Sequence, residues 1–394
     1  MSFFPADTQN SLLQPNPPFA SSALNFATVL DSSNIYAGYG LSVMPVPTSP
    51  GTNLSTFAGA LFSKPKNFPS SYMEEFNLSV QQQLGQNVIT VAYVGELGRK
   101  INLAGGFNVD LPAPSSGAVG PTPYAATLPD VTQINELVPE GASSYHALQV
   151  AFARHFNHGW SMNANYTWSH TIDDIAGSSY VVEPYGLLPG KYSTYDRGNG
   201  DLDLRQRFAV SASYVFSFAD SFTGMKKTLF KGWQMNAIAF WQAGSPYTIE
   251  DGNPQINIGG PALVTADRPD RYTNYAAALI GVAAKGVSTS KIACLGSSHT
   301  GQCFAPQAFG TAGDSMKNIL TGPHQKRVDL SVFRDFPFIE KTKLQFRAES
   351  YDISNTPNFD QPNNDINSTA FNTISGSLPG SDQRVFQFAL KFSY

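Results

Sequence analysis

A hydroxyl, an imidazole and two carboxylates come close together in one short segment of the sequence. Ser169 and His170 follow Trp168, and Asp173 and Asp174 come shortly after them. A nucleophilic hydrolase needs these groups, because a base must activate the serine and a carboxylate must orient the base. The same residues also fit the end of a β-strand that runs into a polar loop, and this structural interpretation is the simpler one. We therefore predict that the chain is not an enzyme.

The loop that follows this segment offers side-chain oxygens that could bind calcium. They belong to Asp196, Asn199, Asp201 and Asp203. Calcium prefers oxygen ligands, but the EF-hand loop places them at a different spacing. A polar loop with turn glycines accounts for the same residues. We predict no metal ion and no cofactor.

The two cysteines, Cys294 and Cys303, lie in a loop-like segment with one histidine, His299, between them. A structural metal site needs more ligands than these residues offer. Close spacing in a segment with glycine and serine instead favours a local disulfide, which is typical of an oxidising compartment. We expect Cys294 and Cys303 to form that disulfide.

The composition points away from an ordinary soluble protein. Charged residues make up 14% of the 394 residues, against about 25% in soluble domains, and aromatic residues make up 12%. The net charge of −4 gives no reason to expect a nucleic-acid partner. No run of 18 apolar residues is present, which excludes a transmembrane helix. Membrane β-strands remain open, because their alternating pattern is averaged out in hydropathy plots.

Alternation of large apolar and small polar residues recurs along the chain and predicts β-strands. The clearest strand begins at Trp160, where Met162, Ala164, Tyr166 and Trp168 alternate with serine, asparagine and threonine. Aromatic residues at both ends of this strand fit the two interfacial girdles of a membrane barrel. The other strands are expected at about 74–84, 88–96, 145–156, 204–218, 230–242, 327–336, 342–353 and 384–394. The pattern of 230–242 is blurred, because Ile238 and Phe240 share a face with Gln234 and Asn236.

The last strand has a large apolar residue at every second position and ends on an aromatic residue. Such an edge would promote aggregation of a soluble protein, whereas a membrane barrel needs one face towards lipid and one towards a polar lumen. A terminal strand of this kind also resembles the C-terminal insertion signal of bacterial outer-membrane barrels, through which we expect contact with the barrel-assembly machinery. The signal residues would be Phe386, Phe388, Leu390, Phe392 and Tyr394.

The connections between the expected strands are alternately short and long. Outer-membrane barrels have short periplasmic turns and long extracellular loops, so the short turns are assigned to the periplasm and the final strand ends there. We therefore predict an all-β fold, an antiparallel transmembrane β-barrel of residues 73–394 in the outer membrane of a Gram-negative bacterium, with lipid as its partner. A secreted soluble β-protein remains an alternative, which predicts extraction without detergent.

The first 72 residues are rich in proline, serine and asparagine and are expected to be a loop-rich upstream segment of the barrel. One short strand around 34–43 could bring the count from nine to ten, since single-chain bacterial barrels have even strand numbers. Residues 1–7 lack the basic and apolar regions of a signal peptide. We therefore expect that the protein is either not exported or is the later part of a longer protein.

Several charged residues of the expected strands would face the lumen of such a barrel. They could contact a substrate or a plug, but pairing among themselves is the simpler interpretation. These residues are Arg205, Arg207, Asp329, Arg347 and Glu349. Four aromatic residues near the loop after 230–242 could stack on a sugar or aromatic ligand or could serve in girdle and loop packing. These are Trp241, Tyr247, Tyr272 and Tyr275.

A set of motifs spread over residues 70–394 suggests a family. The motifs lie at 77–85, 92–95, 145–149, 165–174, 201–208, 232–234, 303–306, 322–323, 329–333 and 346–349. Together they resemble the barrel of TonB-dependent receptor-like proteins of the Oar type, which are abundant in acidobacteria. The resemblance implies the C-terminal part, about nine or ten strands, of a larger barrel of roughly 22 strands.

The family's signal peptide, carboxypeptidase-regulatory-like β-sandwich, TonB box and plug have no counterpart in the sequence. The resemblance implies a receptor that takes up a bulky nutrient, with this chain supplying the barrel wall and the extracellular loops. TonB would act only through the missing N-terminal parts. The alternative is a surface-structural or adhesive barrel without transport.

Overall fold

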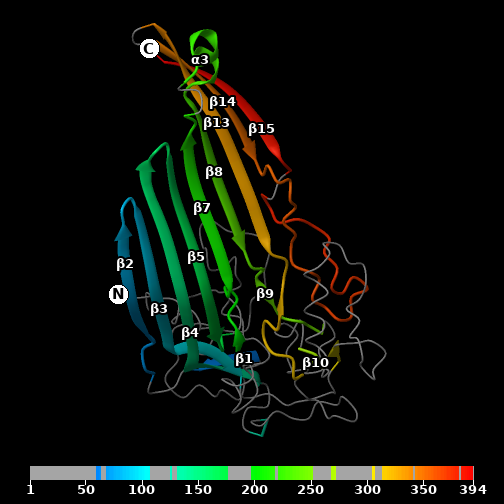
Figure 1. Ribbon diagram of the computed structural model, residues 1–394. Coiled ribbons are helices and arrows are strands. Elements are labelled where there is room, and N and C mark those ends of the chain that lie inside the picture. Colours follow the sequence, from blue (N-terminus) through cyan, green and yellow to red (C-terminus); the bar gives the residue numbers. More distant parts are fainter. Residues whose placement is uncertain are drawn as a thin grey trace, which may run out of the picture.

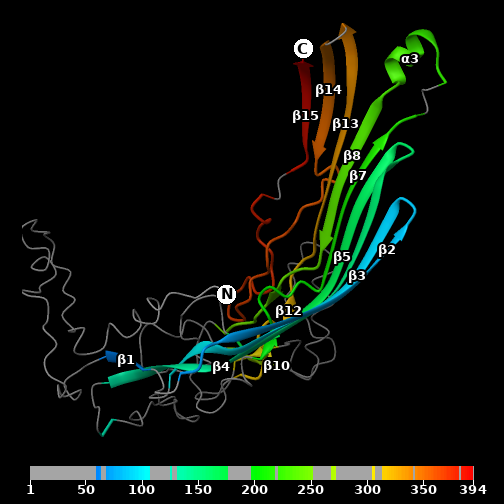
Figure 2. The ribbon, with the colours of Figure 1, turned by 90° about the vertical axis from the view of Figure 1, so that its left-hand side faces the viewer.

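The structure describes residues 59–63, 68–106, 125–126, 131–175, 197–217, 221–251, 268–271, 304–306, 313–339, 342–380 and 383–393. It is a computed structural model, and its main feature is a curved β-sheet (Figures 1 and 2). Nine strands form one path of hydrogen-bonded neighbours, in the order β15, β14, β13, β8, β7, β5, β4, β3 and β2. Their bounds in chain order are Tyr72–Leu84, Asn87–Gly106, Val131–Asn157, Trp160–Asp173, Gln206–Val215, Trp233–Gln242, Gln325–Ile339, Thr342–Tyr351 and Val385–Ser393.

All nine strands of the path pair antiparallel with their neighbours, which confirms the predicted fold class. Two short strands join the same sheet from the side. β1 (Gly59–Ser63) pairs in parallel with β4, and β6 (Gly198–Asn199) pairs antiparallel with β5. The sheet is open in the described residues, with β2 and β15 at its two edges. No helix of the described residues is long and apolar enough to cross a membrane.

Large apolar side chains lie on one face of this sheet from its first strand to its last, and we call it the apolar face. Residues that lie directly opposite each other in an antiparallel pair point to the same face. Tyr93 lies opposite Leu78 on one side and Leu148 on the other, and Leu148 in turn lies opposite Trp168. Further opposite pairs on this face are Tyr166–Phe208, Phe208–Trp241, Val210–Ala239, Ala239–Val328, Val332–Ala348 and Phe346–Leu390.

The other face is rich in small and hydrogen-bonding side chains, and we call it the polar face. Ser213, Asn236 and Ser331 form a row of side-chain hydrogen bonds across three strands, from Ser213 Oγ to Asn236 Oδ1 (2.5 Å) and from Asn236 Nδ2 to Ser331 Oγ (3.4 Å). Ile238 lies on this face opposite Asp329, as its blurred alternation in the sequence predicted. The strand pattern read from the sequence therefore assigns both faces correctly.

Short turns and long connections lie at opposite ends of the sheet. The β2–β3, β4–β5 and β13–β14 turns lie at the upper end in Figure 1, and the long connections lie at the lower end. The β7–β8 connection at the upper end contains a short helix, α3 (Gly224–Phe230). Methionine, lysine and leucine all favour helix, but seven residues are too few to give a clear periodic signal.

Several strands extend further than the alternation indicated. The sequence predicted a long loop from about 97 to 144, whereas β3 continues to Gly106 and β4 begins at Val131. The register between these two strands shifts near Gly98 and Ile101, and Lys100 has a positive φ of 52°. Side-chain alternation fails at such irregularities, although the backbone ladder continues.

The long connections contain a small hydrophobic core of their own. β9 (Pro246–Tyr247) pairs with β12 (Leu320–Thr321), and β10 (Asp270–Arg271) pairs with β11 (Phe304–Ala305). Five buried side chains form the core, and Ile366 and Phe371 from the β14–β15 connection pack against it. The five are Tyr247, Ile249, Phe304, Ile319 and Leu320. The loop segments around this core are therefore packed together.

Candidate functional site where the long loops meet the sheet

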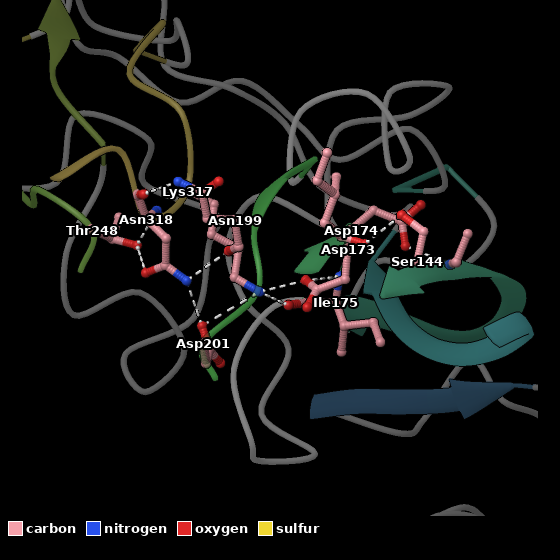
Figure 3. Close-up of polar contacts among 11 residues, drawn as sticks. Ser144, Asp173, Asp174, Ile175, Asn199, Asp201, Thr248, Lys317 and Asn318 are labelled. Carbon is pink, nitrogen blue, oxygen red and sulfur yellow. Dashed lines mark hydrogen bonds and ion pairs between the residues drawn. The ribbon is translucent and has the colours of Figure 1, made fainter. Parts of the chain in front are cut away.

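A cluster of polar side chains connects the long loops to the ends of β5 and β6, and Figure 3 shows its contacts. We call it the loop-anchor cluster; its members are Asp173, Asn199, Asp201, Thr248, Lys317 and Asn318. The residues come from the end of β5, from β6 and the turn after it, and from the loop segments next to β9 and β12. The cluster joins the long loops to the sheet through an ion pair and several hydrogen bonds, and we take it as the candidate site.

Lys317 is the central cation of the cluster. Its Nζ lies 2.7 Å from Asp173 Oδ1 and 3.5 Å from Asp201 Oδ1, and it also donates to the carbonyl oxygen of Ile175. The side chains of Lys317 and Asp173 are only 8% and 12% exposed, whereas that of Asp201 is 49% exposed. A buried charge is costly unless it is paired, so loss of either Lys317 or Asp173 should disfavour the packing of this loop against β5.

Asn318 adds directional hydrogen bonds to the same contact. Its Nδ2 donates to Asn199 O (2.8 Å) and to Asp201 Oδ1 (2.7 Å), while Asn199 Nδ2 donates to Asn318 O (2.9 Å). Thr248 Oγ1 donates to Asn318 Oδ1 (3.2 Å) and accepts from Asn318 N (3.0 Å). Asn318 has a φ of 51°, a left-handed conformation that asparagine tolerates better than most residues.

Two glycines allow the loops to approach this closely. A Cβ at Gly198 would lie 2.4 Å from the backbone oxygen of Lys317, and a Cβ at Gly200 would lie 2.7 Å from Asp173 Oδ2. Real Cβ atoms do not approach other atoms at 2.4 Å. Gly198 therefore allows β6 to lie directly against the loop that carries Lys317, and Gly200 allows the turn after β6 to lie against the end of β5.

Asp174 closes the end of the β4–β5 pair beside the cluster. Its Oδ1 accepts a hydrogen bond from Ala142 N (2.6 Å), and its own N–H donates to Ala142 O (3.2 Å). Burial raises the pKa of Asp174 above its ordinary value, and the hydrogen bond from Ala142 only partly opposes this rise. The buried carboxylate is thus less favourable here than in water.

The serine, histidine and aspartate of the 168–174 segment do not form a catalytic relay. Ser169 Oγ donates to Leu204 O (2.7 Å), and Asp173 pairs with Lys317. Ser169 and His170 are consecutive strand residues, so their side chains point to opposite faces. His170 Nε2 accepts from Arg205 Nη2 (2.8 Å), because arginine can only donate. The interpretation of this segment as a strand end that meets its loop agrees with all three contacts.

The described side chains considered for calcium accept hydrogen bonds or ion pairs from nitrogen donors. Asp203 accepts from Thr171 N (2.7 Å) and from Arg205 Nε (2.6 Å), and Asp201 contacts Lys317 and Asn318. Asp196 lies outside the described residues, and in the described part of the chain no three acidic, histidine or cysteine residues come together as metal ligands. Cys294, Cys303 and their expected disulfide also lie outside the described residues.

The charged residues expected in the lumen lie partly on the polar face and partly at its end. Arg207 lies opposite Thr167 and Gln242. Two neighbouring pairs form on adjacent strands, Arg327 Nε with Asp329 Oδ1 (2.8 Å) and Arg347 Nη1 with Glu349 Oε1 (3.5 Å). Arg205 precedes β7 and binds Asp203 beside the loop-anchor cluster. Whether this face lines a lumen stays a prediction.

The aromatic residues considered for ligand stacking lie in different environments. Tyr247 is 4% exposed inside the loop core, where burial raises its pKa and its Oη donates to Asn372 Oδ1 (3.4 Å). Trp241 lies on the apolar face with its ring centroid 6.5 Å from that of His324. Tyr272 and Tyr275 lie outside the described residues. Packing accounts for Tyr247, so it cannot stack on a ligand in this conformation.

The side chains of the C-terminal strand are well exposed on the apolar face. Phe388 and Leu390 are each 70% exposed, and Phe386 and Phe392 are 56% and 58% exposed. Tyr394 lies outside the described residues. The role of this strand as an insertion signal stays a prediction.

Sequence reasoning did not find Thr248, Lys317 or Asn318. All three lie in the long connection after β8, where no alternation marks them. Lys317 is one of several lysines in this connection, and nothing in the sequence pairs it with Asp173, 144 positions away.

The comparison with protein-family models agrees with this architecture. The family model described as "Outer membrane beta barrel domain" matches residues 1–387. None of the curated proteins compared with the chain matches it.

Three solved structures match the chain at low sequence identity and low TM-score. The outer membrane transporter YddB from Escherichia coli has 11% sequence identity and a TM-score of 0.42, and the match covers 85% of this chain and 34% of that one. The FrpB iron transporter from Neisseria meningitidis (F3-3 variant) has 8% identity and a TM-score of 0.37, with 85% of this chain and 33% of that one covered. The pyoverdine outer membrane receptor FpvA from Pseudomonas aeruginosa PAO1, bound to pyoverdine, has 10% identity and a TM-score of 0.33, with 82% of this chain and 30% of that one covered. The chain spans about a third of the length of these structures.

The family model covers nearly the entire chain, and the sheet has the apolar and polar faces that a membrane wall requires. The chain therefore belongs to the outer membrane β-barrel domain family of the Gram-negative outer membrane.

Proposed function

We propose that the chain is the wall and extracellular loop region of an energy-coupled outer-membrane receptor that takes up a bulky nutrient. The observation that carries the proposal is the continuous apolar face across nine strands, with hydrogen-bonding and charged groups on the opposite face. The apolar face contacts lipid and the polar face lines the lumen. The short turns lie in the periplasm and the long loops lie outside the cell.

The open edges of the sheet support a place in a larger barrel. Unpaired backbone groups cannot lie in the hydrocarbon core of a bilayer, and both β2 and β15 have one unpaired edge in the described residues. In this proposal further strands pair with β2 and β15 and close the wall. A plug and a TonB contact belong to that larger protein, as in the Oar-type receptors that the sequence resembles.

The packed loops support a role in recognition rather than in free diffusion. The hydrophobic core and the loop-anchor cluster hold the connections after β8 and β14 together at the extracellular end. A packed surface of this kind can bind a specific solute, whereas a general pore needs no ordered loop core. The substrate is a solute too large for general porins.

The proposal is tested with cells that lack the gene and cells that carry it. The cells grow on a panel of bulky solutes as sole nutrient, with and without an uncoupler that collapses the proton-motive force. We expect that the gene restores uptake of at least one solute and that the uncoupler abolishes this uptake. Normal uptake of every solute in the cells without the gene, together with loss of attachment to surfaces, would instead support an adhesive or surface-structural barrel.

A further inference from the structure

The helix α3 lies at the short-turn end of the sheet, next to β8 (Figure 2). Contacts of its last turn attach it to the apolar face. The carbonyl oxygen of Leu229, in the last turn of α3, accepts from Trp233 Nε1 (3.0 Å) and from the guanidinium of Arg334. Trp233 and Arg334 lie opposite each other in the β8–β13 pair, on the same face as Met235 and Val332. The helix is therefore on the side that faces lipid in the proposed barrel.

Aromatic packing makes this attachment specific. Arg334 is 4% exposed, and its guanidinium lies 4.3 Å from the ring of Phe336. The ring of Trp233 reaches Phe346 of β14 at a centroid distance of 6.1 Å. These contacts hold the C-terminal turn of α3 against the strands β8, β13 and β14.

The outer surface of α3 combines exposed apolar residues with lysines. Met225, Leu229 and Phe230 are 78%, 51% and 46% exposed. Lys226 and Lys227 are exposed beside them, and the segment 221–233 contains no acidic residue. Apolar residues together with lysines are typical of helices that lie in the plane of a membrane interface.

We propose that α3 is an interfacial anchor that binds anionic phospholipids of the periplasmic leaflet. Met225 and Leu229 insert at the boundary between headgroups and acyl chains, and Lys226 and Lys227 bind lipid phosphates. Trp233 occupies the aromatic girdle at the same depth. The leaflet depends on the orientation in the proposed function, because the short turns are assigned to the periplasm.

The depth of α3 is tested with spin labels on the complete barrel that contains this chain, reconstituted in vesicles. Cys294 and Cys303 are replaced by serine, and one label is placed at Met225→Cys, Leu148→Cys or Leu202→Cys. Leu148 lies on the apolar face of β4, and Leu202 is 89% exposed at the long-loop end. Heat-modifiable migration identifies the folded variants, and accessibility to oxygen and to a water-soluble nickel complex reports lipid and water.

We expect lipid-like accessibility at Met225 and Leu148 and water-like accessibility at Leu202. Water-like accessibility at Met225 with a lipid-like Leu148 overturns the anchor and leaves the proposed function standing. Water-like accessibility at Leu148 overturns the membrane wall itself. The two failures are therefore distinguishable in one experiment.

The phosphate contact is tested by comparing phosphatidylcholine vesicles with vesicles that also contain phosphatidylglycerol. Anionic lipid should increase the ratio of immersed to water-exposed label at Met225, and Lys226→Gln with Lys227→Gln should lower this ratio by about fivefold per lysine. Lys226→Arg with Lys227→Arg keeps the charge and should keep the ratio. Equal ratios in the two vesicle types, or no difference between the glutamine and arginine variants, would overturn lipid phosphate as the ligand.

Discussion

Replacement of Lys317 by methionine should release the long loops from the sheet. Methionine keeps much of the volume of the lysine stem but removes the charge that pairs with Asp173. The Asp173 side chain is 12% exposed, so its carboxylate would be left buried with its cation gone. Removal of one partner of a buried ion pair typically costs about 3–5 kcal/mol, whereas the half-exposed Asp201 contributes at most about 1 kcal/mol.

The expected loss at the lower limit, about 3 kcal/mol, raises the population of the open loops by about a hundredfold. The assay is limited proteolysis of the folded protein in detergent, with the cleavage sites in the long loops identified by mass spectrometry. Cleavage follows the open population when opening is fast compared with cleavage. We therefore expect loop cleavage to be about a hundredfold faster in Lys317→Met, while the strands stay intact.

A second cation serves as the matched control. Lys343 pairs with Asp335 at 3.1 Å, but their side chains are 55% and 41% exposed, so Lys343→Met should leave loop cleavage unchanged. Adding Asp173→Asn to Lys317→Met removes the unpaired carboxylate and should recover part of the protection. The reasoning is refuted if Lys317→Met cleaves within twofold of the original protein, or if the double variant is no better protected than Lys317→Met.

Three further predictions concern the wall and the same end of the sheet. Leu390→Arg places a charge on the apolar face and should cost about 2–4 kcal/mol near the bilayer midplane, so it should block membrane insertion as measured by heat-modifiable migration. Gln387→Arg places the same charge on the polar face and should not block insertion, and equal insertion of both variants would contradict the assignment of the faces. Gly198→Ala should open the loops as Lys317→Met does, because its Cβ would overlap the backbone oxygen at 317; unchanged proteolysis would mean that β6 can move away without cost. The raised pKa of Asp174 means that its contribution to stability is present in full below its unfolded value of 3.8 and is lost as the pH rises through the folded value. Asp174→Asn keeps an amide oxygen that accepts from the backbone, so its loops should be better protected from proteolysis than those of the original protein at neutral pH, with no gain at pH 3. A constant difference across this pH range would remove burial as the cause.

The strands and their faces could be predicted from the sequence because alternation is a local property. Trp160, Met162 and Tyr166 repeat every second residue, and no information from other strands is needed to assign them to one face. Even the exception at Ile238 was visible as a break in the pattern. The pairing order of the nine strands also follows the chain, since neighbours in sequence are neighbours in the sheet.

The loop-anchor cluster could not be predicted in the same way. Lys317 contacts Asp173 only because two irregular connections fold back over the end of β5. Asp173 carried a signal, as part of a possible catalytic segment, but that signal concerned its neighbours in sequence and not its partner. The extension of β3 and β4 was missed because alternation ends near Gly98 while backbone hydrogen bonding continues.

The separation of Lys317 and Asp173 along the chain has a consequence for the order of folding. Their contact joins residues 144 positions apart, and contacts of such high sequence separation form late because their loop-closure entropy must be offset by structure that already exists. Hairpins such as β13–β14 close over a few residues and can form early. A barrel with one mispaired strand would leave the lysine and the aspartate apart, and its loops would be open to proteases. The contact thus makes protease resistance of the loops a measure of correct assembly of the wall.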